Sequence, residues 1–161
     1  MIRISLLPLL ISGSVSMLAC KKSESNGSGA AKSTEAKPTK LPKLNLQVDV
    51  PGTAEVGDAI MGDGNMVQGE AVGAMQVELA KKPQTLDEAK SDADMYSPKN
   101  LKADTLADGW ALTFENTGSM GKNYFVEVRR DIGGKTYTCS TTTGSDKQAA
   151  GTLAACKTLR P

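Results

Sequence analysis

The sequence contains no histidine, and this absence removes the side chain on which most acid–base enzymes depend. Without it, general acid–base catalysis and Ser–His or Cys–His nucleophiles lose their usual partner. A zinc site needs about four ligands, and the three cysteines cannot supply them alone. We therefore expect no cofactor, and the catalytic mechanisms that remain open use carboxylates only. The acids considered for a carboxylate pair are Asp58, Asp63, Glu70 and Glu78.

Aromatic residues are also scarce, at 4% of the chain. Five of the six follow residue 100, so we expect the largest part of the hydrophobic core in that region. The six aromatic residues are Tyr96, Trp110, Phe114, Tyr124, Phe125 and Tyr137.

A large net charge is absent as well, but the total of +1 conceals an uneven distribution. Residues 21–43 contain six Lys and two Glu, whereas residues 44–161 contain 12 basic and 16 acidic residues. A domain that binds nucleic acid needs a basic surface. The mildly acidic C-terminal part therefore predicts no nucleic-acid partner.

The first 19 residues have the features of a secretory signal. Arg3 supplies a positive charge, and an apolar run without further charge extends from Ile4 to Ala19. The run has about 16 residues, fewer than the roughly 20 that a transmembrane helix needs. A plain transmembrane helix, or an ordinary signal peptide followed by an unrelated Cys20, are the alternatives.

The segment Met17-Leu18-Ala19-Cys20 resembles the lipobox of bacterial lipoproteins. In that family the Cys is lipidated on sulfur, the chain is cut before it, and the new N-terminus is acylated. The resemblance implies a signal peptide over residues 1–19 and a lipid anchor at Cys20 in the bacterial cell envelope. Lys21, rather than Asp, follows the Cys; by similarity to enterobacterial sorting this implies the outer membrane, facing the periplasm.

Residues 20–43 are predicted to comprise the lipidated Cys20 and a disordered tether rich in Lys, Ser, Gly and Pro. Leu41 is the one large aliphatic residue of this segment, which has no aromatic residue. Such a composition cannot bury enough apolar surface to offset the entropy of ordering. The remaining residues, 44–161, number about 118 and have the size of a single domain.

The sequence of residues 44–161 predicts both strands and helices. Alternating apolar residues from Leu44 to Val50 are typical of a strand with one buried face. Capping-box patterns at Thr85–Glu88 and Ser145–Gln148 predict a helix from residue 86 to about 96 and a C-terminal helix. Asp63-Gly64 is a turn signal that would close a hairpin. The other predicted strands cover residues 66–70, 74–80, 110–115, 124–129 and 135–142.

These elements predict an α+β fold: one antiparallel sheet of about five to six strands with two helices packed on a face of it. The last three strands are expected to form a meander. Ala149, Leu153 and Cys156 would form the apolar stripe of the last helix.

Cys139 and Cys156 remain once Cys20 is assigned to the lipid. An even pair in an exported chain predicts a disulfide, here joining the last strand to the last helix. A redox pair or a metal site are the alternatives. Redox pairs usually have the C-x-x-C spacing, which these two residues lack, so the disulfide is favoured.

Asp58, Asp63 and Asn65 surround two glycines and suggest a metal site with oxygen ligands. The EF-hand pattern requires D-x-[DN]-x-[DN]-G, which this segment does not supply. The pattern therefore favours a glycine turn with solvated acids over a metal site.

The end of the chain is similar to known small lipoproteins. Tyr137-Thr138-Cys139 resembles the Y-x-C start of membrane-bound lysozyme inhibitors. The segment from Lys135 to Arg160 resembles small envelope lipoproteins of delta-proteobacterial type. The order of strands and helices is similar to the PsbP-like α+β sandwich, a resemblance that implies a fold rather than an activity.

The sequence therefore predicts a membrane-anchored envelope lipoprotein whose domain binds or scaffolds an envelope protein or glycan and is not an enzyme. An inhibitor of a cell-wall enzyme such as lysozyme is one alternative. A carboxylate-based hydrolase is the other.

Overall fold

The computed structural model describes residues 35–60, 62–119 and 121–161. The predicted signal peptide and the predicted lipidation site, Cys20, lie outside these residues. Within the described part of the chain, neither helix is long and apolar enough to cross a bilayer.

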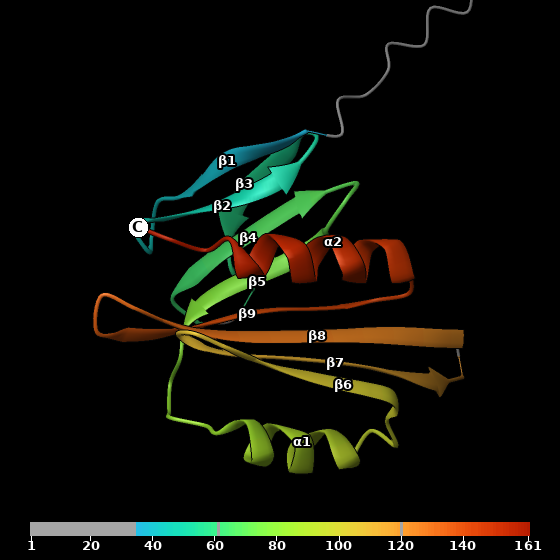
Figure 1. The fold of residues 1–161 in the computed structure, drawn as a ribbon. Helices are drawn as coiled ribbons and strands as arrows, with labels where there is room; N and C mark the ends of the chain where they lie inside the picture. Colours follow the sequence, from blue (N-terminus) through green and yellow to red (C-terminus); the bar gives the residue numbers. More distant parts are fainter. Residues whose placement is uncertain (1–34, 61, 120) are drawn as a thin grey trace, which may run out of the picture. The chain divides into compact units, whose positions relative to one another are not determined.

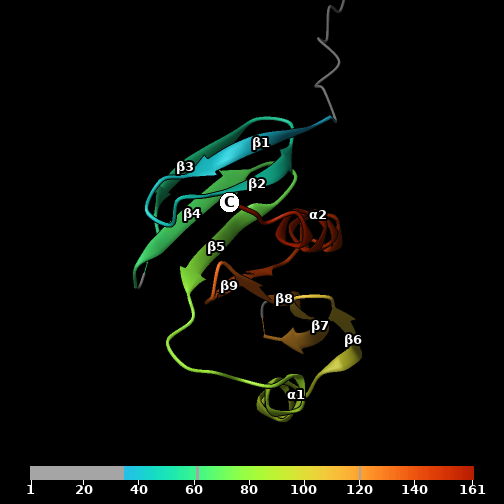
Figure 2. The same cartoon turned by 60° about the vertical axis from the view of Figure 1, so that its left-hand side comes forward.

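Seven strands form an antiparallel sheet in the order β3-β4-β5-β9-β8-β7-β6 (Figure 1). Strands β1 and β2 form a separate antiparallel hairpin, and Gln47 on β2 also makes an isolated β-bridge with Arg160. The two helices lie on opposite faces of the large sheet (Figures 1 and 2). The elements are β1 (Ala36–Leu41), β2 (Leu46–Pro51), β3 (Ala54–Asp58), β4 (Gly64–Gly69), β5 (Gly73–Leu79), α1 (Leu86–Asp94), β6 (Lys99–Leu106), β7 (Gly109–Gly118), β8 (Gly121–Ile132), β9 (Lys135–Thr143) and α2 (Asp146–Lys157).

The pairing register gives the two faces of the sheet different compositions. On the face covered by α2, Val77, Cys139 and Val128 are direct neighbours on three adjacent strands, and all are fully buried. Side chains alternate between the two faces along each strand, so the next row points to the α1 face. This row consists of Met66, Gln76, Ser140, Glu127 and Leu112. The main core thus lies on the α2 face, and the central strands present polar side chains on the other.

The α+β class and the meander of β7, β8 and β9 are confirmed. The predicted strand count was too low, because the large sheet has seven strands and the hairpin adds two. Strand β6 shows why the sequence missed them. It lies at the edge of the sheet, is mostly exposed and pairs only with β7. It therefore has no need of the alternating apolar pattern that predicts a strand.

The expectation that both helices pack on one face was wrong. Trp110 and Leu112 on β7 point to the α1 face, whereas Val126 and Val128 on the paired strand β8 point to the α2 face. Both faces of the sheet thus carry apolar side chains. Because each apolar face needs its own cover, α1 packs on one, with Ala93 in the contact, and α2 packs on the other.

Strand β1 occupies the end of the segment that the sequence predicts to be a disordered tether. It pairs with β2 over its whole length, from Ala36 opposite Pro51 to Leu41 opposite Leu46. Leu41 is fully buried in the main core. The ordered part therefore begins earlier than residue 44, because backbone pairing and one buried leucine order a segment of otherwise polar composition.

Both predicted helix starts are present. At α1, Thr85 Oγ1 accepts from the Glu88 amide and Glu88 Oε2 accepts from the Thr85 amide, which completes the capping box. At α2 only half of the box forms, since Ser145 Oγ accepts from the Gln148 amide. The Gln148 side chain instead contacts Thr143 and the turn before β5.

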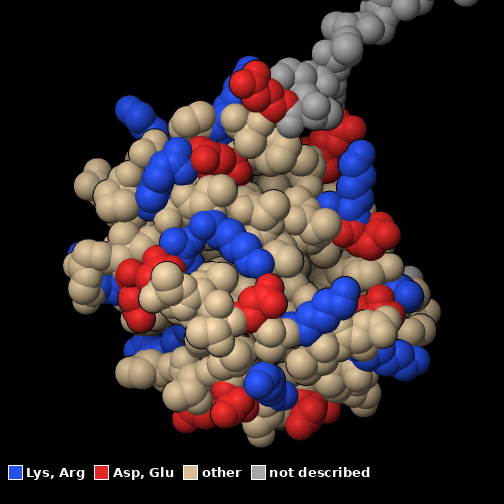
Figure 3. Space-filling model, viewed as in Figure 1, with Lys and Arg blue, Asp and Glu red and all other residues tan. Residues whose placement is uncertain are grey.

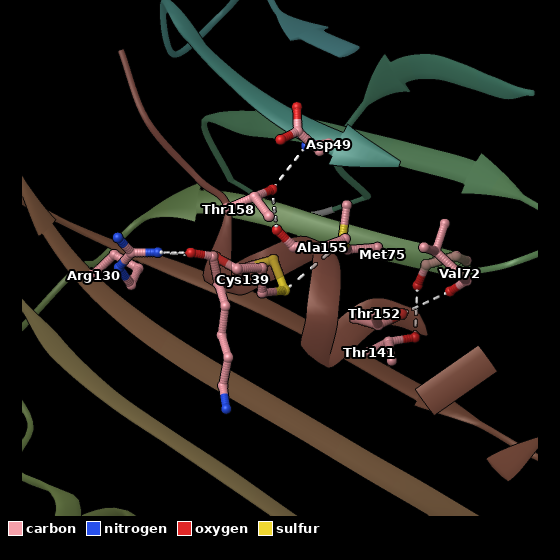
Figure 4. Close-up of a disulfide and its surroundings, with 12 residues drawn as sticks. Asp49, Val72, Met75, Arg130, Cys139, Thr141, Thr152, Ala155 and Thr158 are labelled. Atoms are coloured by element: carbon pink, nitrogen blue, oxygen red, sulfur yellow. Dashed lines mark hydrogen bonds between the residues drawn. A yellow bond between two sulfur atoms is a disulfide. The ribbon is translucent and has the colours of Figure 1, made fainter. Parts of the chain in front are cut away.

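The predicted disulfide between Cys139 and Cys156 is confirmed (Figure 4). It joins the middle of β9 to the last turn of α2, with a Cα–Cα distance of 5.7 Å. Both cysteines are fully buried, and the Met75 sulfur lies 3.7 Å from Cys156 Sγ. The bond therefore fixes helix to sheet in the centre of the main core.

Candidate functional site

A cleft of about 650 Å³ opens on the α1 face of the sheet. Helix α1 lies beside β6 and β7, away from β4 and β5 (Figure 2). It packs against β7, so within the described chain no helix covers this face of β4, β5 and β9. The cleft forms where the sheet continues past the helix.

The floor of the cleft is polar. Gln76 on β5, Ser140 on β9 and Glu127 on β8 are direct neighbours in the register and point to the same face. Thr142 lies two residues further along β9 and also lines the cleft. Three adjacent strands thus contribute an amide, a carboxylate and two hydroxyl groups to one surface.

The walls of the cleft are apolar and unusually exposed. On the α1 side, Met95 is 78% exposed and Tyr96 is 49% exposed. On the opposite side, Ile60 in the loop between β3 and β4 is 76% exposed. This loop is held against the floor because the Ile60 amide donates to Gln76 Oε1 at 2.9 Å.

Three aromatic rings close one end of the cleft. Phe114 and Phe125 are cross-strand neighbours whose rings stack with centroids 4.5 Å apart. The centroids of the Tyr96 and Phe125 rings lie 5.3 Å apart. The backbone carbonyl of Tyr96 accepts a hydrogen bond from Asn116 Nδ2 at 3.3 Å. Mutual contact between the rings fixes their orientation, so this end of the cleft is a preformed apolar surface.

Among the described residues, the charged side chains that line the cleft are Asp92 on α1 and Glu127 on β8, without any Lys or Arg. Gln84 Nε2 donates to Asp92 Oδ2 at 2.8 Å and so orients that carboxylate. Burial raises the pKa of Glu127; the opposite charge of Arg129 acts against this shift, and the like charge of Asp92 adds to it. The cleft is therefore an acidic site with an apolar rim.

Arg129 lies beside Glu127 and is only 9% exposed. One of its nitrogens, Nη1, donates to the Lys82 carbonyl at 2.8 Å, and its guanidinium lies 5.8 Å from the centre of the Trp110 ring. Its Nε is 3.9 Å from Glu127 Oε1 and has no hydrogen-bond partner among the described residues. Arg129 thus compensates part of the Glu127 charge without neutralising the cleft.

Two of the three residues suggested as a metal site have other partners. Asn65 is buried opposite Asp58 on the paired strands β3 and β4. Asn65 Oδ1 accepts from the Lys43 amide, and the Asp58 carboxylate lies 3.0 Å from Lys43 Nζ. Asp63 is exposed in the following turn. Within the described residues, no three His, Cys, Asp or Glu side chains are grouped as metal ligands.

The acids suggested for catalysis do not line the cleft. Asp58 and Asp63 flank the loop between β3 and β4, and Glu70 lies in the turn between β4 and β5. Glu78 lies on β5 beside Gly62. The structure instead places Asp92 and Glu127 at the cleft, and the sequence reasoning did not select either of them.

A sequence signal for the cleft did exist. Glu127 stands between Val126 and Val128, so the strand pattern assigns it to a solvent-facing row. Its neighbours in that row, Phe125 and Arg129, are a ring and a cation. An aromatic side chain and a pair of opposite charges, on a row of the strand that would otherwise face solvent, indicate that a second face of the sheet is partly covered.

Tyr137 and Cys139, from the tripeptide that resembles the lysozyme inhibitors, are both buried on the α2 face. This part of the resemblance therefore belongs to the core and not to an exposed surface.

No protein-family model matches the chain, and no curated protein matches it either.

Proposed function

We propose that this chain is a lipoprotein of the bacterial cell envelope whose domain binds an envelope protein or glycan in the cleft beside α1 without transforming it. Cys20 would carry the lipid after removal of residues 1–19, in the outer membrane and facing the periplasm. Strand β1 begins at Ala36, so residues 21–35 would separate the anchor from the domain.

The observation that carries this proposal is the combination of exposed apolar walls with a convergent polar floor. Met95 and Ile60 are more than three-quarters exposed on opposite walls. Grouped apolar exposure of this kind is typical of surfaces that bind a ligand. A few polar groups converging within an apolar lining are the usual composition of a binding pocket.

The charge distribution supports a partner other than nucleic acid. Lys and Arg are interspersed with Asp and Glu over the face in Figure 3, and no continuous basic stripe crosses that face. In the described part of the chain, the charged residues that line the cleft are both acidic. Phosphate backbones would be repelled there.

Photo-cross-linking in the bacterium tests the proposal. A photoreactive amino acid replaces Met95 at the rim of the cleft, or Ala154 on the exposed side of α2 as the matched control. We expect discrete cross-linked products from position 95 and none of the same size from position 154. A second variant, Ser140→Trp, fills the floor and should abolish the products from position 95.

Equal cross-linking from both positions, or products from position 95 that persist in Ser140→Trp, would contradict binding in the cleft. Retention of the Cys139–Cys156 disulfide and an unchanged circular dichroism spectrum show that the Ser140→Trp chain is folded. Loss of membrane attachment in Cys20→Ser would test the anchor separately.

A carboxylate-based hydrolase is the second candidate, and Glu127 is the observation that favours it. An acid whose pKa is raised by burial can act as a general acid, while a second carboxylate such as Asp92 acts as base or nucleophile. The candidate pair therefore differs from the acids suggested by the sequence. Turnover of a cell-wall glycan that disappears in Glu127→Gln would establish hydrolysis, whereas binding without turnover supports the leading proposal.

A further inference from the structure

We propose that the ligand of the cleft is a peptide segment that carries a Lys or Arg side chain between apolar side chains. This inference rests on the proposed function, since it names the class of ligand for the same cleft. The cation would lie between Asp92 and Glu127, and the apolar neighbours would contact the two walls.

The charges of the cleft leave room for one cation. Asp92 and Glu127 contribute two negative charges, and Arg129, which lies 3.9 Å from Glu127, contributes one positive charge. The site therefore keeps an excess negative charge even when Arg129 is counted. Among the described residues, Arg129 is within ion-pair distance of Glu127 and not of Asp92, and its Nη1 donates to the Lys82 carbonyl. A cationic side chain of a ligand would supply the missing counter-charge.

The walls suit the apolar part of such a segment. Met95 is a flexible, polarizable side chain that adapts to different apolar partners, and Ile60 faces the cleft from the opposite wall. Tyr96 offers a ring for a cation near the helix side. Because these side chains are already exposed, binding would remove apolar surface from water without first breaking contacts in the core.

The floor suits an extended peptide backbone. Gln76, Ser140 and Thr142 combine donors and acceptors on adjacent strands, and these can bond to the amides and carbonyls of a ligand. A neutral glycan would leave the two carboxylates without a counter-charge, and an acidic glycan would be repelled by them. The charge of the cleft therefore favours a cationic peptide over a glycan.

Titration of the full chain in detergent with defined probes tests the inference. The main probe is Ac-Leu-Lys-Leu-Lys-Leu-NH2. The comparison probes replace its Lys by Gln, its Lys by Glu, or its Leu by Ser, and chitotetraose represents a glycan. Affinity is measured by calorimetry, and the site is located by the ¹³C-methyl resonance of Met95. We expect the main probe to bind most tightly and to shift the Met95 signal.

Charge-removing variants provide the matched controls. Glu127→Gln and Asp92→Asn are each expected to lower the affinity for the main probe about tenfold, an effect that calorimetry resolves readily. Asp94→Asn removes one negative charge from α1 at a position outside the cleft lining. The affinity of this variant for the main probe should stay within about twofold of the original value. Circular dichroism confirms that each variant is folded.

Equal binding of the Gln or Glu peptide, or an equal loss in Asp94→Asn, would overturn the choice of a cationic ligand. A Met95 shift with chitotetraose but not with the peptides would also overturn it, while leaving the cleft as the binding site. Silence of the Met95 signal with every probe likewise refutes this inference. The cross-linking experiment at position 95 then decides independently whether the proposed function itself fails.

Discussion

Glu127 lies in the middle of β8, where sheet alternation directs it into the half-covered α1 face. The groups that face it are Asp92 on α1, Arg129 on its own strand, and the neutral Ser140 and Leu112 on the two adjacent strands. Burial raises the pKa of this carboxyl, with Arg129 opposing the shift and Asp92 adding to it. The ionised carboxylate is therefore less favourable in the folded protein than in the unfolded chain.

We predict that Glu127→Gln makes the protein more stable at pH 7. An acid with a raised pKa binds its proton more tightly in the folded state, so stability decreases as pH rises from the ordinary value of 4.5 to the raised pKa. The amide does not ionise and escapes this loss. Urea unfolding at pH 4 and pH 7 measures the effect: the advantage of the variant should be present at pH 7 and largely absent at pH 4.

The exposed Asp94→Asn variant is the control for this prediction: it retains Glu127, so its stability should follow that of the original protein at both pH values. A Glu127→Gln protein that is less stable than the original at pH 7 would show that the Arg129 ion pair outweighs burial. A group that binds a ligand at the expense of stability is a common feature of functional sites.

Arg130, the residue after Arg129 on β8, forms an ion pair that stabilises the fold. Its guanidinium donates to both carboxylate oxygens of Asp108, at 2.7 and 2.8 Å, and these hydrogen bonds lower the pKa of that carboxyl. The same side chain donates to the Lys157 carbonyl at 2.6 Å, at the end of α2. Arg130 therefore connects the turn before β7, strand β8 and helix α2, and it serves the fold rather than the cleft.

Among the elements, helix α2 depends on close approach to the turn between β4 and β5. Thr152 Oγ1 donates to the Val72 carbonyl at 2.9 Å (Figure 4). One residue earlier, Gly151 faces the Ala71 carbonyl, and a Cβ at this position would clash with that backbone oxygen. The buried residues of α2 are Ala149, Thr152, Ala155 and Cys156, and Leu153 from the predicted stripe is half-buried against the same core. The turn approaches the helix where the side chains are smallest.

We predict that Gly151→Ala destabilises the protein by up to about 2 kcal/mol. Helix propensity alone would favour Ala by about 0.8–1.0 kcal/mol, but the new methyl must displace the helix from a rigid backbone, at a cost of about 1–3 kcal/mol. Ala154→Gly, at an exposed position of the same helix, is the matched comparison and should lose about 1 kcal/mol by propensity. Denaturant unfolding distinguishes the two causes. A more stable Gly151→Ala protein would show that no close contact exists.

At the scale of the whole molecule, two apolar layers of unequal size lie on the two faces of one sheet. The larger layer includes the β1–β2 hairpin, α2 and the disulfide, whereas the smaller layer consists of α1 and the rings of β7. The main stability therefore resides on the α2 face. The α1 face, with less apolar contact, has room for a cleft.

We predict that replacing both Cys139 and Cys156 by Ala lowers the free energy of unfolding by about 2–4 kcal/mol. The bond closes a loop with a sequence separation of 17. Removal of the two sulfur atoms also leaves a gap beside Met75, which contacts Cys156 in the main core. Urea unfolding measures the loss. The native protein should retain the bond in mild reductant, since both cysteines are fully buried.

Reduction of the folded protein at the rate of the unfolded chain would contradict this burial. An unchanged unfolding midpoint in the double variant would show that packing of α2 alone fixes the helix to the sheet.

The sequence by itself determined the features that depend on local pattern. Alternation from Leu46 to Val50 specified strand β2, and the Thr85 capping box specified the start of α1. The even pair of Cys139 and Cys156, in a chain predicted to be exported, indicated their bond. Side-chain period and capping are readable because they depend on residues that are close in the chain. The disulfide is readable because the number of cysteines left one pair.

Tertiary structure alone decided the edge strands and the cleft. Strand β1 exists because β2 lies beside it and Leu41 reaches the core, and no local pattern encodes that neighbour. Asp92 and Glu127 meet at one cleft only because α1 covers β7 and leaves the adjoining strands open. The distance between side chains on distant segments depends on sheet register and on which face each helix covers. Those choices minimise exposed apolar surface over the whole molecule, and short-range pattern does not specify them.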